Sequence, residues 1–371
     1  MMARALFIYR VDKSDPSNLG VIHKLHGQVQ GLEAAHLSVD YIVCDRKHIY
    51  KSGQVISETS SSLISKWKFF DYIDRDLING YDIYIIRYGL STPSFIRFLK
   101  DLRNAAPTCK IIIDMPTYPY HQEWTGLKGA IVMRLDRWWS DHLRKYVDAI
   151  LHSGPEDSIH GVSTTPFSNG VDVERVPVRQ PQKDAVIRLL AFAKWREWHG
   201  LDRVIYGLRD YVKTTQRSIH LDVLGTGPTI SKLRSLVLTS DINQYVSFHG
   251  VVHGETLDAF FDKADIGIGT LGLHRKGVAM DSSLKHREFM ARGLPFVMAG
   301  NDRDIDSSLH YIFEVSADDS PIDLDHIVSQ LEQVDAHLIK GEMRSYAEET
   351  LSWKVKMSLL MDQINTSSEE A

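Results

Sequence analysis

Short apolar runs alternate with longer amphipathic stretches along most of the chain. In the first half, the apolar runs are rich in β-branched and aromatic residues and end in polar or turn residues, which favours strands over buried helices. These predicted strands are residues 5–9, 39–44, 83–87, 110–114, 149–152 and 165–167. Amphipathic stretches such as 25–35 and 95–104 separate them. Strands that alternate with helices indicate βαβ units and a parallel sheet.

A polar stretch with prolines, residues 176–184, interrupts this alternation and has the composition of a linker. Strand patterns resume at 188–193, 220–224, 245–249, 266–269, 296–299 and 313–315, with helical patterns at 201–214, 230–238, 256–263 and 284–292. The predicted fold class is α/β, with two tandem Rossmann-like doubly wound domains that face a cleft. We expect domains over 1–172 and 187–345, a linker over 173–186, and a C-terminal helix over 346–371 that packs back on the first domain and ends in a frayed tail.

The composition of the chain excludes several classes of protein. Of the 371 residues, 43% are hydrophobic and 25% are charged, which excludes disordered, collagen-like and disulfide-scaffold classes. The net charge of −5 disfavours a nucleic-acid partner. No run approaches the roughly 18 apolar residues that span a bilayer, and the N-terminal segment lacks the features of a signal peptide. We therefore expect a cytoplasmic protein in which Cys44 and Cys109 are buried thiols.

The first chemically informative segment, residues 191–201, follows the first strand of the second domain. It carries Lys194, Arg196 and His199, which are potential cations at a strand's carboxyl end. Such a group can hold a diphosphate without a metal, because it offsets the charge that builds on the leaving group. A solvated loop anchored by tryptophans is the alternative.

The second segment contains Gly225 and Gly227 directly after a strand. Glycines allow the backbone to approach a phosphate or ribose closely, although they also serve ordinary turns.

The third segment spans residues 280–295. Asp281, Ser282 or Ser283 can cap a helix there, and the first amides of a helix form an anion site. Lys285 lies in the first turn against the helix dipole, which favours a ligand role. Glu288 lies one turn further and can accept the hydroxyl protons of a ribose. The alternative is an ion pair between Lys285 and Glu288 on a solvated face.

Groups that can contact a second ligand are expected in the first domain, at the carboxyl ends of two strands. Residues 114–123 supply Tyr118, His121 and Glu123, whose rings and polar groups can contact a sugar. Arg87 and Tyr88 end the preceding strand and can face the same ligand. A proline-rigidified loop with packed tyrosines is the alternative.

Residues 128–145 combine five basic residues with two acidic ones and with Trp138 and Trp139. A basic, aromatic, amphipathic helix can lie on an anionic membrane, so peripheral contact with the inner face of the plasma membrane is a hypothesis. A core helix is the favoured interpretation.

Two Asp-x-Asp patterns, at 74–76 and 302–304, raise the question of a metal. We expect a solvated face for the first and a position for Asp302 where it could contact the donor. We expect no metal and no cofactor.

The three segments of the second domain together resemble the motifs of GT-B glycosyltransferases, in particular the retaining family 4. The resemblance rests on Ala193-Lys194-Trp195…His199-Gly200, on Gly225-Thr226-Gly227-Pro228, on residues 288–295 and on Asn169-Gly170-Val171-Asp172. The Trp198–Arg203 and Pro116–Tyr120 segments are similar to a subgroup that builds bacterial surface polysaccharides. The resemblance is strong from about 169 to 299 and looser in the first domain.

The chain departs from the family pattern at three places. Met280 stands where the family has its first Glu, with Asp281 one position away. Lys194 and His199 stand where the family has its Arg and Lys pair, and Gly20 alone remains of a glycine pair after the first strand.

The resemblance implies retaining transfer of a sugar from a UDP- or GDP-linked donor to a saccharide or lipid-linked saccharide, in polysaccharide or glycoconjugate synthesis. It implies catalytic roles for Lys194, His199 and Glu288. Residues expected at the donor are Gly20, Arg196, Gly225, Gly227, Val251, Asp281, Ser282, Ser283, Leu284 and Lys285, and those expected at the acceptor are Arg87, Tyr88, Tyr118, His121 and Glu123. A GT-B-shaped nucleotide-sugar epimerase and a non-enzymatic two-lobed binding protein stay as alternatives.

Overall fold

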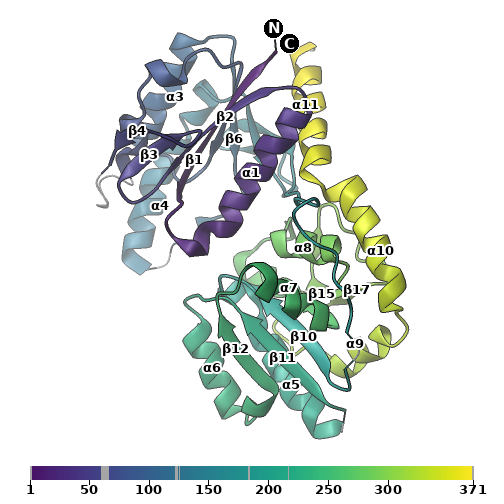
Figure 1. The fold of residues 1–371 in the computed structure, drawn as a ribbon. Helices are drawn as coiled ribbons and strands as arrows, with labels where there is room; N and C mark the ends of the chain where they lie inside the picture. Colours follow the sequence, from purple (N-terminus) through teal and green to yellow (C-terminus); the bar gives the residue numbers. More distant parts are fainter. Residues whose placement is uncertain are drawn as a thin grey trace. The chain divides into compact units, whose positions relative to one another are not determined.

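The computed structural model describes residues 2–59, 67–121, 124, 126–182, 184–215 and 217–369. The chain forms two compact units, Met1–Gly170 with Trp353–Ala371, and Val171–Ser352 (Figure 1). Segment 173–186, whose composition predicts a linker, belongs to the second unit. Arg179 in this segment is 3% exposed, and its Nε donates to the Gly293 carbonyl over 2.9 Å. Composition alone cannot distinguish a free linker from a polar strap that is hydrogen-bonded along its length.

The first unit is built on a nine-stranded sheet in the order β4-β3-β2-β1-β5-β6-β7-β9-β8. The pairings from β2 through β1, β5, β6 and β7 to β9 are parallel, whereas β3, β4 and β8 pair antiparallel. The strands are β1 (Arg4–Asp12), β2 (Ser38–Cys44), β3 (His48–Lys51), β4 (Gln54–Glu58), β5 (Ile83–Arg87), β6 (Lys110–Asp114), β7 (Ala149–His152), β8 (Ser158–Ile159) and β9 (Val162–Pro166).

The hairpin of β3 and β4 was not predicted by the apolar pattern. Ser52 and Gly53 connect its strands with φ values of 45° and 91°, as a two-residue hairpin turn requires. The side chains of β3 and β4 are mostly half-buried or exposed, so these two strands lack the continuous apolar run that marks the central strands.

Helices cover both faces of this sheet (Figure 1). They are α1 (Leu19–Ala34), α3 (Pro93–Ala105), α4 (Gly126–Ser140) and α11 (Trp353–Glu369). α3 begins two residues before its predicted start, because Thr92 accepts a hydrogen bond from the Phe95 amide and Pro93 fits the first turn.

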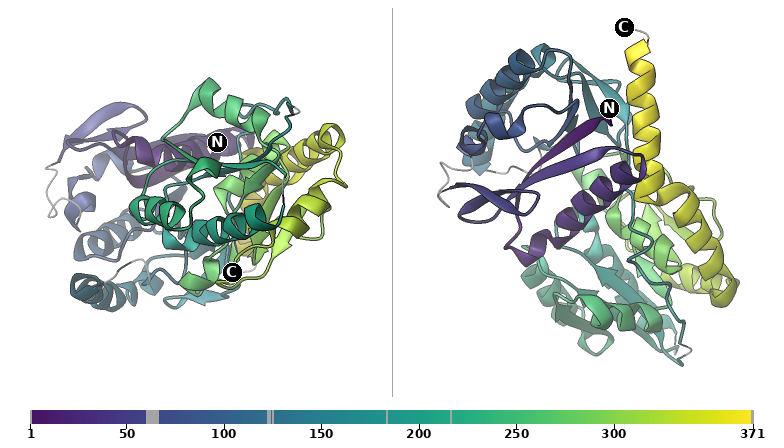
Figure 2. Two further views of the ribbon diagram at one scale, coloured as in Figure 1. Left: turned by 90° about the horizontal axis from the view of Figure 1, so that it is seen from below. Right: turned by 45° about the horizontal axis from the view of Figure 1, so that its top comes forward.

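Two glycines allow α1 and α11 to pack closely (Figure 2). A Cβ on Gly27 would lie 2.0 Å from Cδ1 of Trp353, and one on Gly31 would lie 2.6 Å from the Trp353 carbonyl oxygen. The C-terminal helix therefore belongs to the first unit, as predicted. A frayed tail was expected from residue 366, but the helix continues to Glu369, where the described part of the chain ends.

The second unit contains a parallel six-stranded sheet in the order β12-β11-β10-β13-β15-β17. Its chain order reverses between β10 and β13, which is the doubly wound arrangement. The strands are β10 (Ile187–Phe192), β11 (Ile219–Leu224), β12 (Val246–Gly250), β13 (Ile266–Ile268), β15 (Phe296–Ala299) and β17 (Ile312–Val315). A separate short pair is formed by β14 (Met280–Asp281) and β16 (Asn301–Asp302).

The helices of this unit are α5 (Leu201–Thr214), α6 (Ile230–Thr239), α7 (Gly254–Lys263), α8 (Leu284–Arg292), α9 (Leu324–Leu331) and α10 (Ala336–Tyr346). Each unit has apolar clusters of its own among the buried residues. The two Rossmann-like units confirm the predicted α/β class.

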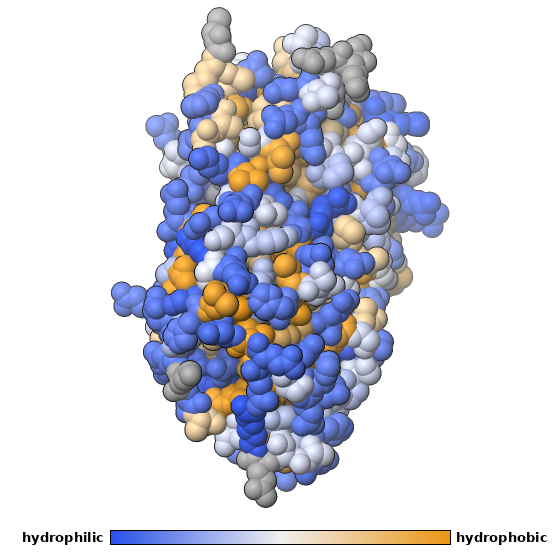
Figure 3. Space-filling model, turned by 90° about the vertical axis from the view of Figure 1, so that its right-hand side faces the viewer, coloured by the Kyte–Doolittle hydropathy of each residue, from blue (hydrophilic) through white to orange (hydrophobic). Residues whose placement is uncertain are grey.

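The face drawn in Figure 3 is mainly hydrophilic with scattered apolar patches, as is usual for protein surfaces. None of the helices described combines the length and hydropathy that crossing a bilayer requires.

Candidate functional site

The loop after β10 is held in place by a buried tryptophan. Trp195 is 1% exposed, and its Nε1 donates to the Leu224 carbonyl over 2.8 Å. Its own amide donates to the Thr226 carbonyl over 2.7 Å. The tryptophan anchor predicted as the alternative for this loop is therefore present. Anchored in this way, the loop still presents Lys194 and Arg196 as exposed side chains.

Gly225 and Gly227 allow this loop to meet the loop after β11. A Cβ on Gly225 would lie 2.0 Å from the Ala193 carbonyl oxygen, and its φ of 100° also favours glycine. A Cβ on Gly227 would lie 2.2 Å from the Trp195 carbonyl oxygen. Loop packing therefore accounts for both glycines, and their donor contact stays a prediction.

A group of positive side chains gathers where β10 and β13 end. We call Arg196, His199, Lys276 and Lys285 the cation cluster. The Lys285 ammonium lies 5.4 Å from the Trp195 ring centroid and donates to the Gly269 carbonyl over 3.4 Å. The Lys276 ammonium lies 4.4 Å from the Trp198 ring centroid. The His199 ring contacts both tryptophans, with centroids 5.6 and 6.1 Å away.

Burial and mutual repulsion shift the protonation of this cluster. Burial is the largest cause that holds the pKa of His199 well below its usual range, and the charges of Lys285 and Lys276 add to it. Burial also lowers the pKa of Lys285 to about 7, against an opposing effect of Asp281. Positive groups that repel one another next to the first turn of α8 form a site suited to an anion.

The lowered pKa disfavours the charged form of His199, and its expected role at a phosphate stays a prediction. Its Nδ1 accepts the Arg196 amide over 3.0 Å, so the proton of the neutral ring lies on Nε2. Lys276, which the sequence analysis did not single out, brings a further ammonium group close to His199. It was missed because it lies 77 residues further along the chain, and only its place in the basic run 274–276 could have drawn attention to it.

Among the described residues, the α8 segment lacks the side-chain cap at Ser283 and the ion pair between Lys285 and Glu288, while the donor roles expected for it stay predictions. Ser283 precedes α8 but makes no capping hydrogen bond with its side chain in the described structure. Lys285 does not pair with Glu288; instead Glu288 Oε1 accepts from Arg292 Nε over 3.1 Å. Lys285 thus stays with the cation cluster, and one oxygen of Glu288 is already engaged.

Asp302 was expected to lie where it could contact the donor, but the structure buries its side chain. It is an internal ion-pair partner: its side chain is 1% exposed, contacts Arg287 and accepts from His286 Nδ1 over 3.1 Å. Asp304 binds the same guanidinium over 2.7 Å. Burial alone would raise the pKa of Asp302, but Arg287 and His286 outweigh it and lower that pKa. Both aspartates of the second Asp-x-Asp pattern therefore form ion pairs with one buried arginine.

The remaining donor candidates take varied positions. In the second unit Ser282 is buried, Asp281 is half-buried, and Leu284 and Val251 are 37% and 45% exposed. Gly20 lies in the first turn of α1 in the first unit, with open space around it.

In the first unit, Tyr88 is a core residue rather than an acceptor-facing one. It is 8% exposed, and its hydroxyl donates to Asp136 Oδ1 over 2.8 Å. Tyr120 donates to the other oxygen of Asp136 over 2.6 Å and lies 3.0 Å from His160 Nε2. The alternative of a loop with packed tyrosines holds for Tyr88 and Tyr120, because a buried carboxylate needs these donors.

Two other acceptor candidates are less buried than Tyr88. Tyr118 is half-buried against the rings of Tyr120, His152 and His160, and His121 is exposed. Glu123 lies outside the described residues.

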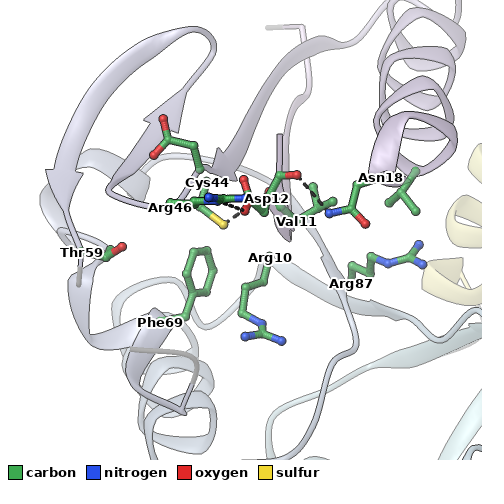
Figure 4. Close-up of a pocket in the computed structure, with 11 residues that line it drawn as sticks. Arg10, Val11, Asp12, Asn18, Cys44, Arg46, Thr59, Phe69 and Arg87 are labelled. Carbon is green, nitrogen blue, oxygen red and sulfur yellow. Dashed lines mark hydrogen bonds and ion pairs between the residues drawn. The ribbon is translucent and has the colours of Figure 1, made fainter. Parts of the chain in front are cut away.

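Arg87 lines a pocket of about 390 Å³ at the carboxyl ends of β1, β2 and β5 (Figure 4). We call it the arginine pocket, because Arg10, Arg46 and Arg87 all line it. Its other lining residues are Val11, Asp12, Asn18, Val21, Cys44, Asp45, Thr59 and Phe69. Of these residues the sequence analysis proposed a ligand-binding role only for Arg87. Figure 4 shows Phe69, Arg10 and Arg87 along one side of the pocket.

Comparison with known proteins identifies the fold. No protein-family model and no curated protein matches the sequence. Solved structures match over nearly the whole chain. Sucrose-phosphate synthase from Thermosynechococcus elongatus has a TM-score of 0.67 at 13% identity, with 99% of each chain covered. Anabaena HepE in complex with UDP and glucose has a TM-score of 0.62 at 11% identity, covering 98% of this chain and 100% of that one.

Trehalose-6-phosphate synthase OtsA is similar to the same degree, with a TM-score of 0.64, 11% identity and coverage of 98% and 99%. These neighbours are GT-B glycosyltransferases, so the chain has the GT-B fold. The predicted fold class is thereby confirmed.

Proposed function

We propose that this protein is a glycosyltransferase that moves a sugar from a nucleotide-sugar donor to a saccharide acceptor with retention of anomeric configuration. The cation cluster at the carboxyl ends of β10 and β13 carries the proposal. Ligands of doubly wound sheets bind at this switch point, and the GT-B fold is shared with sugar-transferring enzymes. A UDP-linked donor is supported by the Anabaena neighbour, which was solved with UDP-glucose.

In this proposal the cation cluster binds the diphosphate. Lys285 and Lys276 offset the charge that develops as the sugar leaves, and the Nε2–H of neutral His199 donates a hydrogen bond. Lys194 reaches the same group from its exposed position. Glu288 accepts from the ribose with its second oxygen, while Arg292 fixes the first. These cations make a metal unnecessary for neutralising the diphosphate.

Retention follows if attack occurs on the face that the donor phosphate leaves. The acceptor hydroxyl then adds to the anomeric carbon as the carbon–oxygen bond to the phosphate breaks. The departing phosphate oxygen takes the hydroxyl proton, so a protein nucleophile is not needed.

The test is a calorimetric titration of the full chain with UDP and GDP. We expect one of them to bind, and Lys285→Gln to weaken that binding by about tenfold or more, the effect of one lost charge-assisted contact. Lys213→Gln, an exposed lysine of α5, is the matched control and should leave affinity unchanged. Equal affinities in all three proteins would contradict the proposal.

An acceptor assay separates the alternatives. Release of nucleoside diphosphate only after a saccharide is added supports the transferase. Inversion of the donor sugar without an acceptor would support an epimerase, and binding with no turnover would support a binding protein.

A second proposal concerns α4, which is not the core helix that the sequence favoured. Its buried residues are Gly129, Asp136 and Ser140, all on one face. Asp136 joins α4 to the unit through the tyrosine hydroxyls described above. The helix is therefore anchored by a polar face.

The opposite face of α4 is apolar and exposed. Leu127, Ile131, Leu135 and Trp138 follow a helical spacing and are 82%, 55%, 43% and 71% exposed. Three basic residues of α4, Lys128, Arg134 and Arg137, are also exposed, while its one acidic residue is the buried Asp136.

We propose that this face lies on an anionic lipid bilayer, where lipid-linked saccharides occur. Apolar residues flanked by cations are what such a surface recognises. This contact would bring the protein to the inner face of the plasma membrane.

Co-sedimentation with vesicles tests the contact. We expect binding to anionic vesicles and little to zwitterionic ones. The double variant Ile131→Gln and Trp138→Gln should lose most of it, whereas Leu338→Gln with Leu359→Gln, a pair also more than half exposed, should not. Equal losses in both double variants would refute the role of α4.

A further inference from the structure

The lining of the arginine pocket contains more arginines than carboxylates. Its lining contains three guanidinium groups, from Arg10, Arg46 and Arg87, and two carboxylates, from Asp12 and Asp45. The thiol of Cys44 adds no negative charge at neutral pH, because burial raises its pKa to about 11. The pocket thus has a net positive lining.

Both carboxylates are engaged by their own surroundings. Asp45 accepts from the amides of Lys47 and His48 over 2.7 Å each, and from the Tyr50 hydroxyl over 2.5 Å. Asp12 accepts from the amide and the hydroxyl of Ser14 over 2.9 and 2.6 Å, and it lies 3.8 Å from Arg46.

That last distance is too long for a hydrogen bond. Asp12 therefore leaves hydrogen-bonding capacity on Arg46.

Arg87 has hydrogen-bonding capacity that no described group uses. Its Nη1 is buried and makes no hydrogen bond within the described part of the chain. The Asp114 carboxylate lies 3.8 Å away, but it is taken by Lys24 over 3.0 Å and by the Tyr9 hydroxyl over 2.7 Å. A buried N–H without an acceptor costs free energy unless a ligand supplies one. Asp114 thus orients Arg87 without satisfying it.

From these contacts we infer that the arginine pocket binds an oxyanion on the acceptor, so that the acceptor is a phosphorylated or carboxylated saccharide. The inference deepens the proposed transferase function and rests on it. Guanidinium forks match the geometry of phosphate and carboxylate oxygens. Phe69 and Val21 supply an apolar wall that can contact a sugar ring. The pocket volume of about 390 Å³ is of the size of small-ligand sites.

Calorimetry on the full chain tests the inference with a panel of hexose 6-phosphates, hexose 1-phosphates and hexuronates, beside the neutral hexoses and inorganic phosphate. We expect at least one anionic sugar to bind tenfold or more tightly than its neutral counterpart and than inorganic phosphate. Its affinity should fall as salt rises, because the pocket is partly open to solvent. The panel also decides between phosphate and carboxylate.

Two variants locate the binding. Arg87→Gln should weaken binding of the anionic sugar by at least tenfold, and Arg46→Gln by severalfold. Arg46 is 75% exposed, so its replacement does not endanger folding. Arg97→Gln, which removes an exposed arginine paired with Asp71 in the same unit, is the control and should have no effect. A loss as large in the control, or neutral sugars binding as tightly as anionic ones, would overturn the inference.

UDP titrations of the same proteins separate this inference from the proposed function. We expect wild-type UDP affinity in Arg87→Gln and Arg46→Gln. If UDP binds but no anionic sugar does, only the acceptor inference fails. If UDP and GDP both fail to bind the wild-type chain, the proposed function fails.

Discussion

Single side chains in the cation cluster are held in protonation states that an anion would change. Burial beside Trp195 lowers the pKa of Lys285 to about 7, and burial together with the neighbouring lysines lowers the pKa of His199. In the proposed function, a bound diphosphate would favour the charged forms of both groups.

The affinity for UDP should therefore depend on pH in a defined direction. A bound anion raises the pKa of Lys285 above about 7, so binding at pH 8 must take up a proton. We expect affinity to fall as pH rises from 7 to 9, by at most about tenfold per unit. Calorimetry in HEPES and in Tris, which differ in ionisation enthalpy, measures the proton directly. Equal heats in the two buffers at pH 8 would contradict this assignment.

Arg287 shows how a plausible motif can have a structural cause. Asp302 and Asp304 have the spacing of a metal motif, yet both hold one fully buried guanidinium. The sequence could not reveal this, because the arginine that explains them lies 15 residues earlier on another element.

Among the elements, the packing of α1 on α11 depends on the absence of side chains. Gly27 and Gly31 lie one turn apart, and Trp353 and Met357 fill the space that their missing Cβ atoms leave. Glycine inside a helix costs roughly 1 kcal/mol relative to alanine, so close packing must compensate.

Gly27→Ala should therefore destabilise the protein by about 1–3 kcal/mol, the usual cost of overpacking. Gly20→Ala is the matched control on the same helix, where nothing lies within 4 Å of the added Cβ. It should stabilise by up to about 1 kcal/mol. Urea unfolding followed by circular dichroism measures both. If both variants change stability alike, the close helix contact is not responsible.

α4 is the element whose role changed most between sequence and structure. Its pattern is amphipathic in either setting, and a core helix was favoured because apolar faces usually point inward. The structure turns the polar face inward, because Asp136 is bound by Tyr88 and Tyr120, which lie 48 and 16 residues away.

For the whole molecule, the chain builds two units and then returns to the first. α11 contributes Trp353, Met357, Leu360 and Ile364 to the same apolar cluster as β1 and α1. The second unit contains its apolar clusters within Val171–Ser352.

Truncation after Ser352 should therefore affect the two units unequally. We expect amides of β1 and α1 to lose hydrogen-exchange protection, because the cut exposes their core, while those of β10 to β17 keep it. Exchange measured by mass spectrometry on the full and truncated chains gives the comparison. Uniform loss of protection would show that the second unit does not fold independently.

The sequence by itself determined the alternation of strands and helices and the two Rossmann-like units, because these depend on local periodicity and on turn residues. It located Lys285 and Arg87 for the same reason: each stands at the end of a recognisable element. Tertiary structure alone decided which side chains meet. Lys276 joins His199, Arg292 engages Glu288, and the pocket arginines converge because parallel strands bring distant residues to one sheet edge. No local pattern records such partners, since the contacts form only when the elements pack.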